Sequence, residues 1–132
     1  MKAIIIGAGD VGFHLASRLS SQGDEICVLD LEREKVDRVE DHLDVMALQG
    51  TGVDYALLEK AGVDTADTLI AVTDNDEVNL QACRIAGLYG VRLKVARAGG
   101  GYYYRKSSSA PFVDPGADVL VNPERACAAE IE

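Results

Sequence analysis

Hydrophobic positions along this chain alternate between short unbroken runs and helical repeats. The first run occupies residues 3–6. Val11, Leu15 and Leu19 follow it at intervals of four residues. An unbroken apolar run predicts a strand buried on both faces, and the four-residue repeat predicts an amphipathic helix that ends near Gly23.

A second strand and a second helix are predicted in the same way. Residues 26–29 form another apolar run, and the segment 31–41 that follows is strongly charged. Leu31, Val36 and Val39 are expected on the inner side of this charged helix, facing the sheet.

Further strands and helices follow in the same alternation. Strands are expected at residues 45–48, 69–72, 93–96 and 119–121, and helices at residues 55–60 and from the acidic run 74–77 to about Leu88. Thr51 and Asp54 have the spacing of a capping box before the shorter helix. Repeated strand–helix alternation with short connections predicts a Rossmann-type, doubly wound α/β fold, with a mainly parallel six-stranded sheet and helices on both faces.

Regular patterning stops after the fifth predicted strand. Residues 99–112 are rich in glycine, serine and tyrosine without a clear period, which predicts an irregular crossover segment. After the sixth strand, Asn122 and Pro123 are typical of the cap and first position of a last helix. The length of 132 residues predicts a single domain over residues 1–132. A C-terminal ligand domain or a second repeat could follow this domain in a longer protein.

Acidic side chains outnumber basic ones by 22 to 13, which gives a formal net charge of −9. Such a field repels phosphate backbones, so no nucleic acid is expected as a partner. No stretch approaches the roughly 18 apolar residues of a membrane span. The three cysteines form no C-x-x-C pair, which favours neither a disulfide framework nor a zinc site. A cytoplasmic location is therefore expected.

A glycine-rich turn joins the first predicted strand to the first predicted helix, with the sequence Gly7-Ala8-Gly9-Asp10-Val11-Gly12. In dinucleotide-binding folds, glycines with this spacing allow a tight turn and let a pyrophosphate approach a helix N-terminus. Asp30 ends the second strand, where a carboxylate can bind the hydroxyls of an adenosine ribose and repel a 2′-phosphate. NAD(H) is therefore favoured over NADP(H). Alternatively, this region binds no ligand, the glycines serve only to form a tight turn, and Asp30 is only the last residue of a strand.

Three other strand ends would face a ligand in this fold. Gly50 and Thr51 follow the third strand, Thr73 and Asp74 follow the fourth, and Arg97 ends the fifth. An arginine there can pair with a phosphate, and a solvated surface arginine is the alternative. For Thr51 and Asp74, helix capping alone is the alternative.

No catalytic residue is identified in this sequence. Tyr102 and Lys106 have the Y-x-x-x-K spacing of short-chain dehydrogenases, but a loop flanked by glycine and serine replaces the helix that this pair requires. His14 and His42 have no partners at metal-ligand spacing, and no metal site is expected. The acidic run 74–77 is interpreted as a solvated helix start.

Over nearly its whole length, the chain resembles the TrkA-N domains, also called RCK or KTN domains, which regulate potassium transporters and channels. The resemblance rests on MKAIIIGAGDVG, VLD, LQGTG, LLEKAGVDTAD, LIAVTDNDEVNLQAC and DVLVNPE, in this order. It implies that NAD(H), or alternatively ATP or ADP, binds as a regulatory ligand without being turned over. The implied contacts are to phosphate from residues 7–12 and Arg97, to ribose from Asp30, and further contacts around Thr51, Thr73 and Asp74.

The resemblance also implies a role in a potassium uptake system. Such a domain forms a homodimer or a ring on the inner face of the cell membrane, and gates an integral-membrane potassium transporter subunit by a ligand-dependent conformational shift. Residues 99–109 depart from the family, which usually has a polar, helix-initiating segment there. Two other functions stay open, namely the cofactor-binding half of an NAD-dependent dehydrogenase and a purely structural scaffold with an empty pocket.

Overall fold

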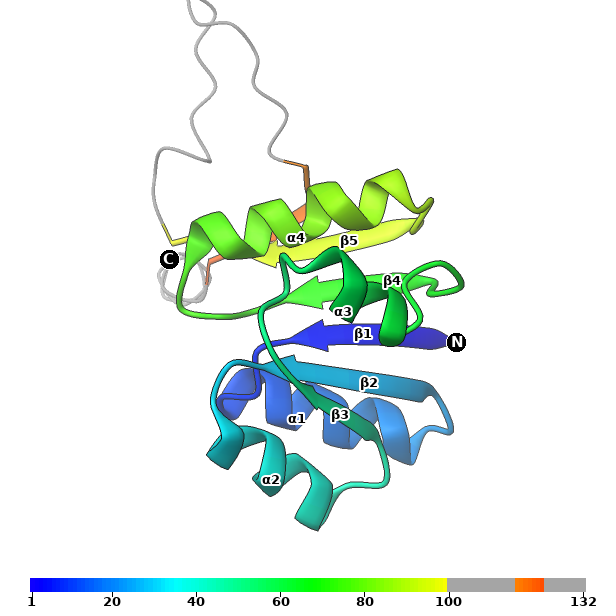
Figure 1. The fold of residues 1–132 in the computed structure, drawn as a ribbon, viewed down its shortest axis with the longest axis vertical. Coiled ribbons are helices and arrows are strands. Elements are labelled where there is room, and N and C mark those ends of the chain that lie inside the picture. The colour runs from blue at the N-terminus through cyan, green and yellow to red at the C-terminus, as the bar shows by residue number, and fades with distance from the viewer. Residues whose placement is uncertain (100–115, 123–132) are drawn as a thin grey trace, which may run out of the picture.

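The computed structural model describes residues 1–99 and 116–122. Strands and helices alternate along these residues (Figure 1). The strands are β1 (Lys2–Ile6), β2 (Glu25–Asp30), β3 (Met46–Gln49), β4 (Thr68–Ala71), β5 (Leu93–Arg97) and β6 (Val119–Val121). The helices are α1 (Asp10–Ser21), α2 (Arg33–His42), α3 (Tyr55–Lys60) and α4 (Asp76–Leu88). The predicted last helix and residues 100–112 of the predicted irregular segment lie outside the described residues.

The six strands form one sheet in the order β3-β2-β1-β4-β5-β6, and every neighbouring pair is parallel. The chain therefore moves outward from β1 to β3, crosses back to β4 beside β1, and moves outward again to β6. This order confirms the predicted doubly wound, Rossmann-type fold. The sheet is parallel throughout, where the sequence predicted a mainly parallel one.

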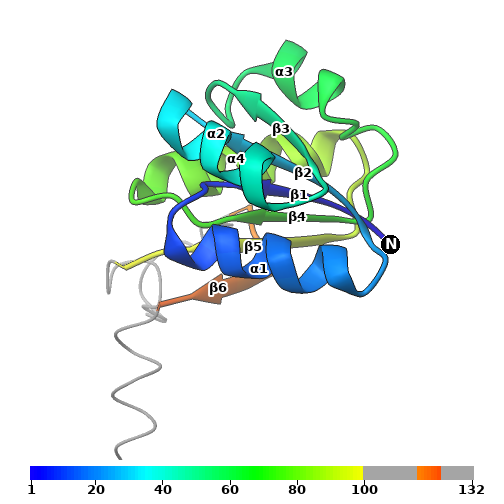
Figure 2. The same ribbon diagram turned by 90° about the horizontal axis from the view of Figure 1, so that it is seen from below.

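The central strand β1 packs against a hydrophobic core on each face of the sheet. Ile4 and Ile6 belong to the core that includes side chains of α3 and α4. Ala3 and Ile5 belong to the core that includes side chains of α1 and α2. Successive strand side chains point to opposite faces, so a strand covered on both faces needs an unbroken apolar run. Figure 1 shows α3 and α4 in front of the sheet and α1 behind it, and Figure 2 shows the arrangement from below.

Two side chains expected on inner helix faces are exposed. Val11, in the first turn of α1, is 46% exposed, and Leu31, which precedes α2, is 66% exposed. Both lie at the carboxyl edge of the sheet, where the strands end and the core no longer covers a helix face. The fully buried positions of α1 are Gly12 and Ala16. The other expected inner positions are buried or partly buried, namely Leu15, Leu19, Val36 and Val39.

The N-cap of α3 is Asp54, so the capping box predicted to start at Thr51 is wrong. The Asp54 carboxylate accepts hydrogen bonds from the N–H groups of Ala56 and Leu57 at 3.0 and 3.3 Å. The Thr51 hydroxyl instead accepts from the N–H of Val53 at 3.3 Å. The reason is that Thr51 and Asp54 close a turn of their own before the helix begins.

Candidate functional site

A cleft of about 620 Å³ opens at the carboxyl ends of the strands. It lies where the connection from β1 passes to one face of the sheet and the connection from β4 passes to the other, which is where ligands bind in this class of fold. The cleft is lined by ten of the twelve residues predicted as ligand contacts, namely Gly7, Gly9, Asp10, Val11, Asp30, Gly50, Thr51, Thr73, Asp74 and Arg97. The other two, Ala8 and Gly12, are buried.

The glycine-rich turn between β1 and α1 forms one wall of the cleft. Gly7 has a φ of +105°, a left-handed conformation that residues with a side chain rarely adopt. A Cβ atom added to Gly12 would collide with the carbonyl oxygen of Gly7, so this glycine lets the helix start close to the strand. A Cβ atom added to Gly9 would meet no atom within 4 Å. Packing therefore does not require a glycine at this position, and its backbone borders the open cleft.

The N-terminus of α1 opens onto the cleft without a side-chain cap. Its N-cap residue is Gly9, which has no side chain to accept hydrogen bonds from the N–H groups of the first turn. Together with the positive end of the helix dipole, such N–H groups form a binding site for phosphate. The Asp10 carboxylate is exposed and lies 3.7 Å from the guanidinium of Arg38 in α2. The first turn can therefore receive an anion from the cleft.

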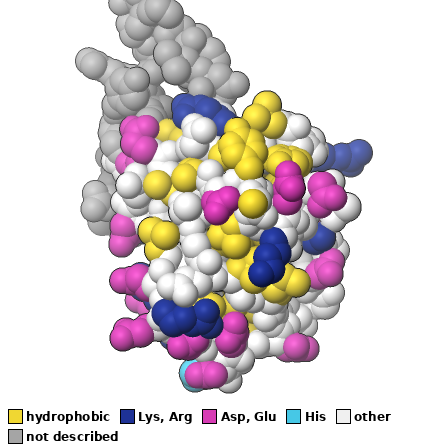
Figure 3. Space-filling view, viewed as in Figure 1, with side chains coloured by type: hydrophobic (Ala, Val, Ile, Leu, Met, Phe, Trp, Pro, Cys, Tyr) yellow, Lys and Arg dark blue, Asp and Glu magenta, His cyan; other side chains and the backbone are white. Residues whose placement is uncertain are grey.

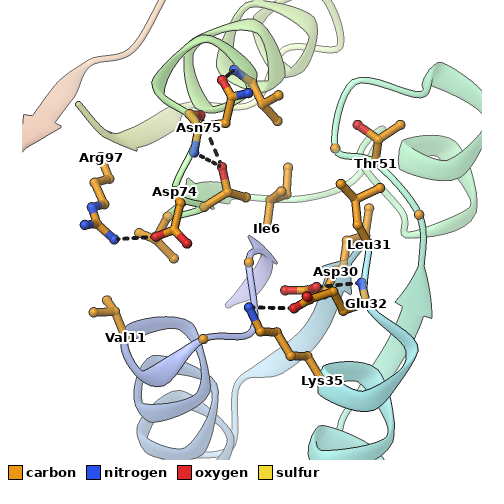
Figure 4. A pocket seen from close by; sticks show the side chains of 18 of the residues that line it. Ile6, Val11, Asp30, Leu31, Glu32, Lys35, Thr51, Asp74, Asn75 and Arg97 are labelled. Carbon is orange, nitrogen blue, oxygen red and sulfur yellow. Dashed lines mark hydrogen bonds and ion pairs between the residues drawn. The ribbon is translucent and has the colours of Figure 1, made fainter. Parts of the chain in front are cut away.

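The Asp30 carboxylate at the end of β2 is fixed by two backbone N–H groups. Its Oδ2 accepts a hydrogen bond from Ala8 at 2.7 Å, and its Oδ1 accepts one from Glu32 at 2.8 Å (Figure 4). The first bond fixes the carboxylate relative to the N-terminus of α1. Each carboxylate oxygen can accept a second hydrogen bond. Asp30 can therefore still receive the two hydroxyls of a ribose.

The loop after β3 is attached to the same end of the cleft. The N–H of Gly50 donates to the carbonyl oxygen of Asp30 at 2.9 Å. Thr51 follows directly and also lines the cleft. The loop therefore borders the region where a ribose bound to Asp30 would lie.

Arg97 and Asp74 lie together at the other end of the cleft (Figure 4). The Nη1 atom of Arg97 is 3.4 Å from Oδ1 of Asp74, and the side chains are 35% and 95% exposed. The N-cap of α4 is Asn75, whose side chain accepts a hydrogen bond from the N–H of Val78 at 3.1 Å. Asp74 is therefore not a helix cap, which removes the alternative interpretation of this residue.

Asn79 of α4 holds this end of the cleft together, a role that was not predicted from the sequence. It is fully buried. Its Oδ1 accepts from the N–H and the hydroxyl of Thr73 at 3.0 and 2.6 Å. Its Nδ2 donates to the carbonyl oxygens of Thr73 and Arg97 at 3.0 and 2.9 Å. One feature of the sequence could have identified it. Asn79 precedes the apolar residues Ala82 and Cys83 by three and four positions, which places its amide on the buried face of a helix.

Glu32 and Lys35 line the cleft near Asp30 and were also missed. The Nζ atom of Lys35 is 2.8 Å from the Glu32 carboxylate. This hydrogen bond raises the pKa of Lys35 above its ordinary value, and the negative charges of Asp30 and Asp74 act in the same direction. Lys35 is therefore positively charged at neutral pH. Because α2 is strongly charged, the sequence pattern could not distinguish Lys35, which lines the cleft, from the charged side chains of α2 that face only solvent.

Residues 1–99 and 116–122 contain neither a candidate metal site nor a candidate membrane span. No three His, Cys, Asp or Glu side chains in this part of the chain form a group that could hold a metal ion. None of its helices combines the length and hydrophobicity that crossing a membrane requires. Tyr102 and Lys106, which have the dehydrogenase-like spacing, lie outside the described residues.

Two curated relatives are each named Trk system potassium uptake protein TrkA. The one from Azorhizobium caulinodans is 38% identical over 129 residues, which cover 94% of this chain and 28% of the relative. The one from Halomonas elongata is 39% identical over 127 residues, which cover 95% of this chain and 28% of the relative. The chain thus spans 28% of the length of each of these relatives.

Three solved structures have the same fold. The TrkA-N domain of the inner membrane protein ybaL from Escherichia coli has a TM-score of 0.82 at 22% identity, covering 98% of this chain and 93% of that one. The Shewanella denitrificans Kef CTD in AMP-bound form has a TM-score of 0.75 at 24% identity, covering 99% and 77%. The GsuK channel bound to NAD has a TM-score of 0.72 at 19% identity, covering 91% and 21%.

The family model of the TrkA-N domain matches residues 3–123, which is most of the chain. The match includes the glycine-rich turn, Asp30 and the other strand ends that line the cleft. The chain belongs to the TrkA-N domain family.

Proposed function

We propose that this chain is a regulatory domain of a potassium uptake system and binds an adenine nucleotide, with NAD(H) as the first candidate and ATP or ADP as the alternative. The proposal rests on the hydrogen bond between Asp30 and Ala8, which fixes a carboxylate beside the uncapped N-terminus of α1. A helix end that attracts phosphate thus lies next to an acceptor for ribose hydroxyls. The names of the two curated relatives support the potassium uptake system. The AMP and NAD bound to two structural neighbours support the ligand class.

Regulation is proposed to work by a shift of conformational populations. A ligand shifts an equilibrium only by the difference between its affinities for the two states. The cleft extends from Asp30 on β2 to Arg97 on β5, so nucleotides of different length would contact different parts of its wall. Their unequal fit to two arrangements of a homodimer or ring would gate an integral-membrane potassium transport subunit. The domain would act at the cytoplasmic face of the membrane, without turning its ligand over.

Replacing Asp30 with alanine is expected to weaken nucleotide binding about a hundredfold, because two charge-assisted hydrogen bonds to the ribose are lost. The variant also loses the acceptor for the N–H groups of Ala8 and Glu32. Its free energy of unfolding is therefore expected to fall by about 2 kcal/mol. Isothermal titration of the wild-type and variant chains with NAD⁺, and separately with ATP, measures the change in Kd.

Glu25→Ala is the matched control for this substitution. It removes an exposed carboxylate at the opposite end of the same strand, away from the cleft, and is expected to leave the affinity unchanged. Comparing the Tm of each variant with and without nucleotide separates lost binding from lost stability. A folded Asp30→Ala chain with wild-type affinity would contradict the proposal. So would a wild-type chain that binds neither NAD⁺ nor ATP.

A further inference from the structure

Both positively charged side chains in the described lining of the cleft already have a carboxylate partner. These side chains are Lys35 and Arg97. Lys35 lies 2.8 Å from Glu32, and Arg97 lies 3.4 Å from Asp74. A phosphate group that pairs with either cation must therefore compete with a carboxylate of the protein.

Carboxylates outnumber cations in this lining, with Asp10, Asp30, Glu32 and Asp74 against two basic side chains. Figure 3 shows acidic side chains along the left of the molecule, the side toward which the strands run in Figure 1. A cleft lined mainly by one sign of charge focuses the field inside it. The cleft therefore disfavours a highly anionic ligand, except where the N-terminus of α1 offers N–H groups to a diphosphate.

The geometry of the cleft determines which part of a nucleotide would meet this field. Asp30 and Lys35 lie at one end of the cleft, and Asp74 and Arg97 lie at the other (Figure 4). A nucleotide with its ribose on Asp30 and its diphosphate at the N-terminus of α1 extends the rest of the molecule toward Asp74. In ATP that remainder is a third phosphate. In NAD⁺ it is a nicotinamide riboside, whose ring is positively charged.

We propose that Asp74 determines ligand specificity, favouring NAD⁺ over ATP by holding Arg97 and repelling a third phosphate. This inference rests on the proposed nucleotide-binding function and adds a choice of ligand to it. A third phosphate that pairs with Arg97 must share the guanidinium with the Asp74 carboxylate, which stays close to the phosphate as a like charge. The nicotinamide ring is instead attracted by Asp74. The carboxylate is 95% exposed, so a ligand in the cleft can reach it.

Asp74→Asn is expected to bind ATP about fivefold more tightly than wild type, and to change the affinity for NAD⁺ by no more than about twofold. Titrations of the full chain with each nucleotide, without added divalent cation, measure both Kd values. Asp64→Asn is the charge-matched control. Asp64 is exposed and precedes β4, at the edge of the sheet opposite the cleft. The control is expected to leave the ratio of the two Kd values unchanged.

The same substitution in an Arg97→Gln background tests how Asp74 acts. If the gain for ATP comes from releasing Arg97, it is expected to shrink to about twofold or less in this background. A full gain in the Arg97→Gln background would overturn the role assigned to the Arg97 contact and leave repulsion alone as the cause. An equal gain for ATP and NAD⁺ in Asp74→Asn would overturn the whole inference. If wild type binds both nucleotides and Asp74→Asn leaves their ratio unchanged, only this inference fails. If wild type binds neither, the proposed function fails and this inference fails with it.

Discussion

Replacing Gly12 with alanine is expected to lower the free energy of unfolding by about 3 kcal/mol and the Tm by about 10 °C. The added Cβ would collide with the carbonyl oxygen of Gly7. That carbonyl belongs to a turn in which the N–H of Gly7 donates to the carbonyl oxygen of Leu29 at 2.8 Å. Because backbone atoms on both sides are held in place, α1 must move away from β1. Thermal and urea unfolding followed by circular dichroism measure the loss.

Gly9→Ala is the control within the same turn. Its Cβ would meet no atom within 4 Å, so the expected cost is below about 1 kcal/mol, from the N-cap position alone. This variant is nevertheless expected to bind nucleotide more weakly, because a methyl group at the helix start obstructs the approach of a diphosphate. Equal stability of Gly9→Ala and Gly12→Ala would show that close contact between α1 and β1 is not what Gly12 provides.

Replacing Asn79 with alanine is expected to lower the free energy of unfolding by about 3 kcal/mol. The buried amide makes two hydrogen bonds as acceptor from Thr73, and one as donor to each of the carbonyl oxygens of Thr73 and Arg97. Alanine fills neither role, so the N–H and carbonyl of Thr73 and the carbonyl of Arg97 each lose a part-buried hydrogen bond. Urea unfolding with a linear extrapolation measures the change.

Asn75→Ala is the matched control for Asn79→Ala, since both remove an asparagine near the start of α4. The Asn75 side chain accepts a hydrogen bond from Val78 at the exposed N-cap, and its loss is expected to cost about 1 kcal/mol. If both variants lost the same free energy, the bonds of Asn79 would be worth no more than an ordinary helix cap. The assignment of Asn79 as the residue that joins β4 to β5 would then be wrong.

Two hydrogen-bonded connections set the shape of the cleft, one at each end. Asp30 joins the end of β2 to the glycine-rich turn after β1, and Asn79 joins the end of β4 to the end of β5. Asp30 is also exposed to the cleft, so it can bind a ligand as well as support the fold. Asn79 is fully buried. Its effect on a ligand must therefore pass through Thr73 and Arg97.

Local patterns predicted the regular elements well. The sixth strand was predicted at residues 119–121 and is observed there, and α4 ends at Leu88 as predicted. An unbroken apolar run is required in a strand buried on both faces, such as β1. Such a run also marks β6 at the edge of the sheet, although Val119 and Val121 are 44% and 40% exposed. The patterns failed for Val11 and Leu31. Their place in a helical repeat could not show that they lie beyond the edge of the core, where they are exposed.

The sequence by itself determined the alternation of strands and helices, the glycine-rich turn at the start of α1 and the acidic end of β2, because these features depend on short-range periodicity and on neighbours along the chain. Only the tertiary structure decided that Asn79 bonds to the carbonyl of Arg97, 18 residues away, and that Arg97 pairs with Asp74, 23 residues away. These contacts join side chains to strand ends that meet only when β4 and β5 pair in the sheet. Their partners and distances therefore depend on the whole fold.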